Sequence, residues 1–164
     1  MRAVWLLGAA SLLLFAGLAA WLAPLEPGVL RLQFAFTPRA FGTVIHLWSA
    51  EDLARYRAHF PWDFLLLGGY AAFGFLFARR APLFTRLPAS ARTGAAWLLP
   101  LAAVFDAVEN AFHLWLTAAP RFGVPQAYAL SALASTAKWL LLVAFAGALL
   151  VALARHPSAP CRGD

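Results

Sequence analysis

Four blocks of apolar residues dominate the chain, at about residues 4–23, 60–78, 93–119 and 126–154. An α-helix rises about 1.5 Å per residue, so about 20 apolar residues cross a hydrocarbon layer of about 30 Å. Each block is long enough to do so. The pattern therefore predicts an all-α integral membrane protein, a bundle of four transmembrane helices that forms a single domain over residues 1–164.

The first apolar block has two interpretations. Gly17, Ala19 and Ala20 near its end resemble the small residues of a signal-peptidase site. However, the block is longer than the usual apolar core of a signal peptide, and Trp21 follows at the position of a membrane interface. These features favour a retained transmembrane helix, and the sequence leaves cleavage open.

Residues 24–59, between the first two blocks, are expected to include two short amphipathic helices on the external membrane surface. Thr37 precedes a proline, which is typical of a helix start, and apolar residues follow at helical spacing. These apolar residues are Phe41, Val44, Ile45 and Trp48. Ser49 and Asp52 then match a capping box, and Glu51 lies one turn before Arg55, with which it can pair.

The residues just before these helices show a different pattern. Leu30, Leu32, Phe34 and Phe36 alternate with less apolar residues, which predicts a short extended strand. A lone strand leaves its backbone edges unpaired, so an irregular interfacial loop is the alternative.

The charges predict how the chain is oriented. Residues 79–92 carry four arginines and no acid, whereas the turn near Arg121 carries a single base. Because basic residues favour the cytoplasmic side, we expect both termini and residues 79–92 in the cytoplasm. Enrichment in arginine and alanine suggests a GC-rich bacterial genome, and the predicted location is the bacterial inner membrane.

Composition excludes several classes of protein. The chain is 63% hydrophobic and 12% charged, well below the charged fraction of soluble domains. Its formal charge of +6 lies in connecting segments rather than in a basic patch with interleaved aromatic residues, so we expect no nucleic acid partner. Cys161 is the single cysteine, which excludes an internal disulfide framework. No cofactor is predicted.

The third block contains four polar residues on one face. At about 100° per residue, Asp106, Glu109, Asn110 and His113 fall on a single helical stripe. A carboxylate near the centre of a bilayer costs several kcal/mol unless it meets a cation, a proton or a polar cavity. The stripe should therefore face protein.

Lys138 is the only lysine among thirteen basic residues, and it lies near the middle of the fourth block. Counting inward from Trp115 and Tyr128, at about 1.5 Å per residue, places Asp106 about 13 Å deep and Lys138 about 15 Å deep. The short turn between the two blocks makes them antiparallel neighbours. We therefore predict an ion pair between Asp106 and Lys138.

Further polar residues extend this candidate site. Ser135 falls level with Glu109 and Ser131 level with His113, while Asp63 stands at the outer end of the second block. Residue types that bind zinc are present, namely His59, Asp63, Glu109 and His113. None of the established zinc spacings occurs, so a metal site is the minor alternative and no metal is predicted.

Three short motifs resemble those of small bacterial membrane proteins of unknown role that have four spans. They are Phe36-Thr37-Pro38, Trp62-Asp63-Phe64 and Phe105-Asp106-Ala107-Val108-Glu109-Asn110. The resemblance covers Leu25 to Leu153 and implies that Asp63, Asp106, Glu109 and Asn110 are the family's marked positions, without implying an activity. In architecture alone, the chain also resembles sterol-isomerase-like four-helix membrane domains, with no motif matched residue by residue.

These observations predict a polar pocket between the second, third and fourth blocks that opens outward. We expect it to bind a small lipophilic or cationic ligand, or to relay protons, in contact with the lipid bilayer. Asp106 and Glu109 would be acceptors and Lys138 their counter-ion. His113 and Asn110 would form the outer polar wall, and Asp63 would lie at the opening of the pocket.

Three alternatives remain open. In the first alternative, the chain is an accessory subunit or assembly factor, and the glycines of the second block contact a membrane-protein partner or a second copy. In the second alternative, the chain is a lipid-modifying or isomerising enzyme in which Glu109 or His113 exchanges a proton with the substrate. No motif supports this alternative, so enzymatic activity is not favoured. In the third, the polar stripe only fixes helix register.

Overall fold

The computed structural model describes residues 1–119 and 121–155, and 84% of the structure is helical. None of the described residues lies in a strand. The elements are α1 (Arg2–Leu22), α2 (Val29–Gln33), α3 (Pro38–Leu47), α4 (Ala50–Ala58), α5 (Phe60–Arg80), the 3-10 helix η1 (Pro82–Arg86), α6 (Ala89–Leu116) and α7 (Pro125–Ala154). Four helical stretches are long and apolar enough to cross a membrane, namely α1, Ala50–Arg80, α6 and α7. The predicted fold class is confirmed.

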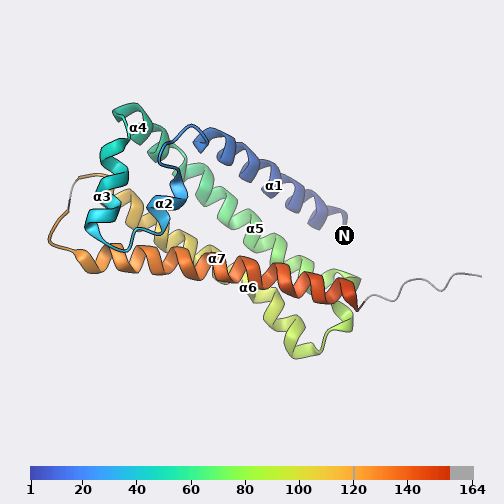
Figure 1. The fold of residues 1–164 in the computed structure, drawn as a ribbon. Helices are drawn as coiled ribbons and strands as arrows, with labels where there is room; N and C mark the ends of the chain where they lie inside the picture. Colours follow the sequence, from blue (N-terminus) through green and yellow to red (C-terminus); the bar gives the residue numbers. More distant parts are fainter. Residues whose placement is uncertain (120, 156–164) are drawn as a thin grey trace, which may run out of the picture.

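The long helices form a bundle in which α6 packs between α5 and α7, while α1 lies along α5, apart from α7 (Figure 1). Small residues allow these close approaches. A Cβ atom added at Gly69 would lie 2.7 Å from Ser11 Oγ on α1, and one at Gly74 would lie 2.5 Å from Leu99 on α6. Gly69 and Gly74 therefore pack against helices of the same chain.

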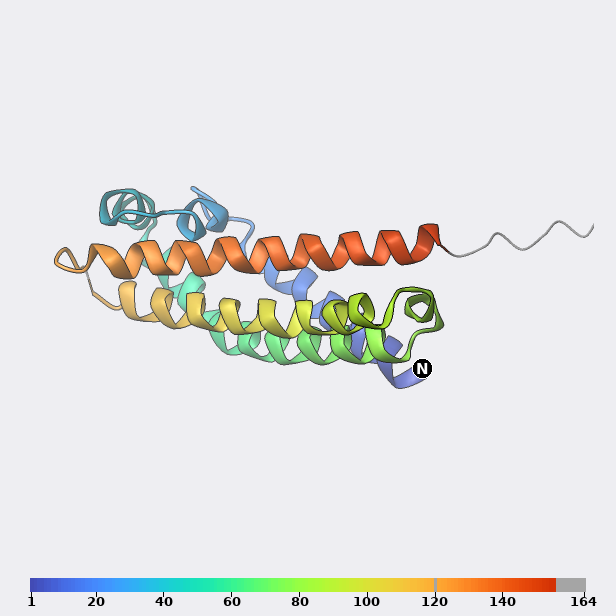
Figure 2. The ribbon, with the colours of Figure 1, turned by 90° about the horizontal axis from the view of Figure 1, so that it is seen from below.

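The short helices α2, α3 and α4 gather at one end of the bundle, as Figures 1 and 2 show. The Thr37 side chain accepts a hydrogen bond from Ala40 N at 3.1 Å, and Ser49 and Asp52 form a reciprocal capping box. Both predicted helix starts are confirmed. The expected Glu51–Arg55 pair is not among the ion pairs of the described residues; the Arg55 guanidinium instead lies 5.2 Å from the centre of the Trp21 ring.

The predicted strand before α3 is wrong, because residues 29–33 form the helix α2. Leu32 is buried and Leu30 is exposed, whereas residues two apart would lie on the same face of a strand. α2 packs against α3 and α7, so no strand lies beside it. A helix satisfies its backbone hydrogen bonds internally, which a lone strand at an apolar surface cannot do.

The core divides into two clusters along the bundle. Near η1, the buried residues are all apolar and include Phe77, Phe84, Leu99 and Phe145. At the end that carries α3 and α4, a second cluster includes Trp48, Tyr56, Phe60 and Tyr128. The N-terminus and the last turn of α7 lie at the same end as η1 (Figures 1 and 2). We call these two parts the η1 half and the α3 half.

Candidate functional site

Lys138 on α7 lies between two carboxylates of α6. Its Nζ is 2.9 Å from Asp106 Oδ1 and 2.6 Å from Glu109 Oε2. The three side chains are buried, with exposed fractions of 4% for Lys138, 8% for Asp106 and 1% for Glu109. The predicted Asp106–Lys138 ion pair is confirmed, and because Glu109 follows Asp106 by three residues on the same helix face, one ammonium reaches both acids.

Polar contacts extend from this pair of acids in both directions. On one side, the Tyr70 hydroxyl donates to Asp106 Oδ2 at 3.2 Å. On the other, Glu109 Oε1 lies 3.9 Å from His113 Nδ1, which is in turn 2.6 Å from the Tyr56 hydroxyl. The result is a connected row of polar side chains from the middle of α5 to the short helix α4.

Asp63 joins the same site through a different contact. Asn110 Nδ2 donates to Asp63 Oδ2 at 2.6 Å and so connects α6 with α5. Asp63 thus pairs with Asn110, whereas His113 pairs with Tyr56. His59, one turn before Asp63, is buried and its Nδ1 contacts the Tyr56 carbonyl.

The two predicted serines of α7 lie deeper in the helix packing. Ser135 is fully buried and donates to the Ser131 carbonyl at 3.1 Å, within its own helix. Ser131 is also buried, and its hydroxyl has no hydrogen-bond partner among the described residues. Neither serine reaches the cavity described below.

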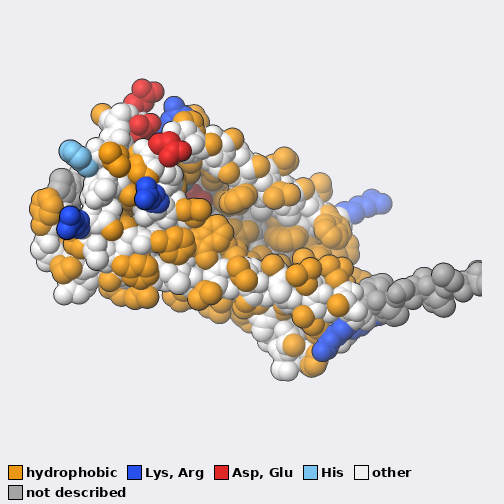
Figure 3. Space-filling view, viewed as in Figure 1, with side chains coloured by type: hydrophobic (Ala, Val, Ile, Leu, Met, Phe, Trp, Pro, Cys, Tyr) orange, Lys and Arg blue, Asp and Glu red, His pale blue; other side chains and the backbone are white. Residues whose placement is uncertain are grey.

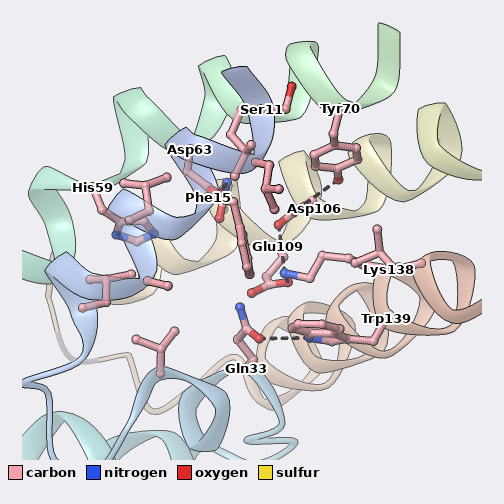
Figure 4. Close-up of a pocket in the computed structure, with 18 of the residues that line it drawn as sticks. Ser11, Phe15, Gln33, His59, Asp63, Tyr70, Asp106, Glu109, Lys138 and Trp139 are labelled. Atoms are coloured by element: carbon pink, nitrogen blue, oxygen red, sulfur yellow. Dashed lines mark hydrogen bonds and ion pairs between the residues drawn. The ribbon is translucent and has the colours of Figure 1, made fainter. Parts of the chain in front are cut away.

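A cavity of about 420 Å³ lies against the charged residues, between α1, α5, α6 and α7, with α2 at its edge. Five of the eight predicted site residues line it, namely Asp63, Asp106, Glu109, Asn110 and Lys138, whereas His113, Ser131 and Ser135 do not. Figure 3 shows this face of the molecule hollowed, and Figure 4 shows the acids and Lys138 together on its inner side.

The predicted walls of the pocket need one correction, because α1 contributes a whole side of the cavity. Its lining residues on α1 include Leu12, Phe15, Leu18 and Leu22. Apart from Ser11, the middle of α1 carries no polar side chain that would mark the face turned to the cavity. Ser11 itself lines the cavity, so this one residue was the only indication of the wall in the sequence.

Two further residues at the cavity were missed. Trp139 Nε1 donates to Gln33 Oε1 at 3.1 Å, which connects α7 with the short helix α2 (Figure 4). Both side chains line the cavity. The position of Trp139 next to Lys138 was the only available signal, since the sequence pattern of residues 29–33 suggested no helix.

No group of three His, Cys, Asp or Glu side chains suited to a metal ion occurs within residues 1–119 and 121–155. His59, Asp63, Glu109 and His113, the candidate ligands, are instead engaged with Tyr56, Asn110 and Lys138. Cys161 lies outside the described residues. The arrangement is therefore one of ion pairs and hydrogen bonds beside an apolar cavity.

No protein-family model matches this chain, and no curated protein or solved structure matches it significantly. The fold and the site thus define its class on their own. The chain is a multi-span helical membrane protein with a buried network of charged side chains.

Proposed function

We propose that the protein binds a small amphipathic molecule in the cavity between α1, α5, α6 and α7. The observation that carries the proposal is a cavity of about 420 Å³ that combines buried charged residues with apolar walls. Ligand sites in proteins are typically concave, mostly apolar and provided with a few polar groups, with volumes of about 300–1,000 Å³. This cavity fits that description.

The two sides of the cavity suit the two parts of such a molecule. Leu12, Phe15 and Leu18 of α1 offer contacts to a hydrocarbon body. Asp106 and Glu109, with Lys138 as their counter-ion, offer charged and hydrogen-bonding contacts to a polar end. In this proposal Asn110 belongs to the polar wall and Asp63 stands at the mouth.

The η1 half argues against a proton relay that crosses the membrane. Between Asp106 and Thr93, α6 carries no charged side chain over about 20 Å of helix. The segment of α5 between Tyr70 and Arg79 is equally free of charge. A polar path that stops at mid-bundle suits binding of a ligand better than transfer of protons from one side to the other.

Two alternatives lose support for specific reasons. A network that only fixes helix register does not require a cavity beside it, since interhelical polar contacts serve that purpose within packed helices. For an accessory subunit, a partner was expected on the glycine face of α5, but two of the three glycines there contact this chain, Gly69 at Ser11 and Gly74 at Leu99, and only Gly68 is open.

The proposed setting is the bacterial inner membrane, with both termini in the cytoplasm. The η1 region carries the arginine cluster of the chain, at Arg79, Arg80, Arg86 and Arg92. Because lysine and arginine are enriched in cytoplasmic loops, this end is assigned to the cytoplasm. The cavity and the short helices then belong to the opposite leaflet and its surface.

The proposal is tested by identifying what the purified protein retains. The chain is purified in a mild non-ionic detergent, extracted with organic solvent and analysed by mass spectrometry. We expect one small amphipathic molecule per chain, and its loss in Ala19→Phe, which places a ring in the cavity wall. Ala20→Phe, the same change at the next, exposed position, is the matched control. Identical extracts from all three proteins would refute the proposal.

A further inference from the structure

The charged groups that line the cavity do not balance one another. Three carboxylates, those of Asp63, Asp106 and Glu109, line it together with one ammonium, that of Lys138. The ammonium already contacts both Asp106 and Glu109. When all four groups are ionised, the lining therefore carries two negative charges in excess, in surroundings where unpaired charge is costly.

His59 adds a hydrogen-bond acceptor that is independent of these acids. It is 6% exposed and lines the cavity, as Figure 4 shows. Its Nδ1 contacts the Tyr56 carbonyl, and a carbonyl can only accept, so Nδ1 carries the hydrogen. In the neutral ring Nε2 is then an acceptor, and no partner for it occurs among the described residues.

The main donors at the cavity are already engaged. The Tyr70 hydroxyl donates to Asp106, Asn110 donates to Asp63, and Trp139 donates to Gln33. The cavity therefore offers more acceptors than donors. A ligand that fits it brings its own N–H or O–H groups and a positive charge.

We infer that the polar end of the ligand is a protonated primary or secondary amine, carried on an apolar body. This inference rests on the proposed function, that the cavity binds an amphipathic molecule. A protonated primary amine donates its three N–H groups to Asp63, Glu109 and His59, a protonated secondary amine donates its two to a pair of these acceptors, and the charge of either offsets the excess of carboxylates. Its apolar body packs on Phe15 and the neighbouring residues of α1.

Four amphiphiles with the same twelve-carbon chain separate the contributions of charge and hydrogen bonding. Dodecylamine has both, dodecyltrimethylammonium has charge without N–H, dodecanol has a donor without charge, and dodecyl sulfate has the opposite charge. Each is added to the wild-type chain in zwitterionic lipid nanodiscs, and native mass spectrometry counts the molecules retained per chain. Ala19→Phe, measured in parallel, gives the retention that does not depend on the cavity.

We expect dodecylamine to be retained with at least a tenfold higher apparent affinity than the other three. Cavity-dependent retention of the amine, the alcohol and the quaternary ammonium to equal extents would overturn the amine inference and leave the proposed function standing. Preferential retention of dodecyl sulfate would likewise overturn the amine inference and leave the proposed function standing. Absence of cavity-dependent retention for every amphiphile would overturn the proposed function as well.

Two substitutions test the contacts themselves. Asp63→Asn removes one carboxylate from the cavity lining, and we expect it to reduce dodecylamine retention about tenfold while leaving dodecanol retention unchanged. Glu51→Gln removes an equal charge from the exposed surface of α4 and should change neither. Equal amine retention in Asp63→Asn and Glu51→Gln, with both chains folded, would contradict the inference.

Discussion

The α3 half and the η1 half of the bundle are built from the same long helices but are stabilised in different ways. In the η1 half, apolar side chains such as Phe77, Phe84 and Leu99 fill the interior. In the α3 half, Glu109 and Lys138 are buried among hydrogen-bonded polar side chains, and a cavity adjoins them. The η1 half is therefore held by apolar packing, whereas the α3 half contains the buried network of charged side chains.

The two halves should also respond differently to substitution. In lipid, burial of apolar surface gives little net driving force between helices, so the η1 half depends on the shape of its close contacts. The α3 half depends on charge balance, because removing one partner of a buried ion pair leaves an uncompensated charge. The four predictions that follow test this difference, in order of decreasing effect.

The largest effect is expected for Lys138→Met, which leaves Asp106 and Glu109 buried without their counter-ion. We expect a loss of about 3–5 kcal/mol in the free energy of unfolding, measured by denaturant titration in mixed micelles. Arg92→Met, which removes a charge at a partly exposed position of α6, should change it by about 0.5 kcal/mol or less. Equal losses in the two variants would refute the difference between the halves.

A smaller loss is expected for Gly74→Leu in the η1 half. A Cβ atom at Gly74 would lie 2.5 Å from Leu99, so the added side chain forces α5 and α6 apart. We expect a loss of about 1–3 kcal/mol in unfolding free energy. Gly68→Leu, where nothing lies within 4 Å of the added Cβ, should be tolerated. Equal unfolding free energies for Gly74→Leu and Gly68→Leu would show that close packing of α5 against α6 does not stabilise the η1 half.

Tyr56→Phe should have a more modest effect in the α3 half. It removes the hydroxyl that lies 2.6 Å from His113 Nδ1 and leaves a buried ring nitrogen without that partner. We expect a loss of about 1–2 kcal/mol in thermal or denaturant unfolding. Tyr128→Phe removes a hydroxyl that contacts only the Arg121 carbonyl, and it should cost less. The reverse order would show that the row of polar contacts does not extend to α4.

The smallest effect on stability is expected for Phe15→Ala on α1, because Phe15 is 52% exposed. We expect a change of about 0.5 kcal/mol or less in unfolding free energy, together with a clear loss of the molecule retained in the cavity. Leu13→Ala, an exposed position outside the cavity lining, should affect neither. Retention equal to wild type in Phe15→Ala would exclude α1 from the binding site.

The centre of the site could be predicted from the sequence for a simple geometric reason. Depth along a straight helix follows from residue number, so Asp106 and Lys138 were placed at the same level on neighbouring helices. The contacts of Tyr56, Tyr70 and Gln33 could not be predicted in this way. They depend on how α4, α5 and α2 are rotated and positioned, which no periodicity in the sequence specifies.

Other parts of the fold lacked a distinguishing pattern. α1 is apolar on nearly every side, so its sequence does not show which side faces the cavity. The residues of α2 are too few to separate a period of two from a helical period, and the predicted strand was wrong for that reason. By contrast, Thr37 and Ser49 have local capping contacts, and both helix starts were predicted correctly.

The central claim is that Lys138 is the shared counter-ion of Asp106 and Glu109 inside the bundle. The most direct test is a mutant cycle that compares the unfolding free energies of Lys138→Met, of the pair Asp106→Asn with Glu109→Gln, and of all three changes together. We predict that the triple variant is more stable than Lys138→Met alone, with a coupling energy of at least about 2 kcal/mol. Losses that simply add, to within about 0.5 kcal/mol, would contradict the account.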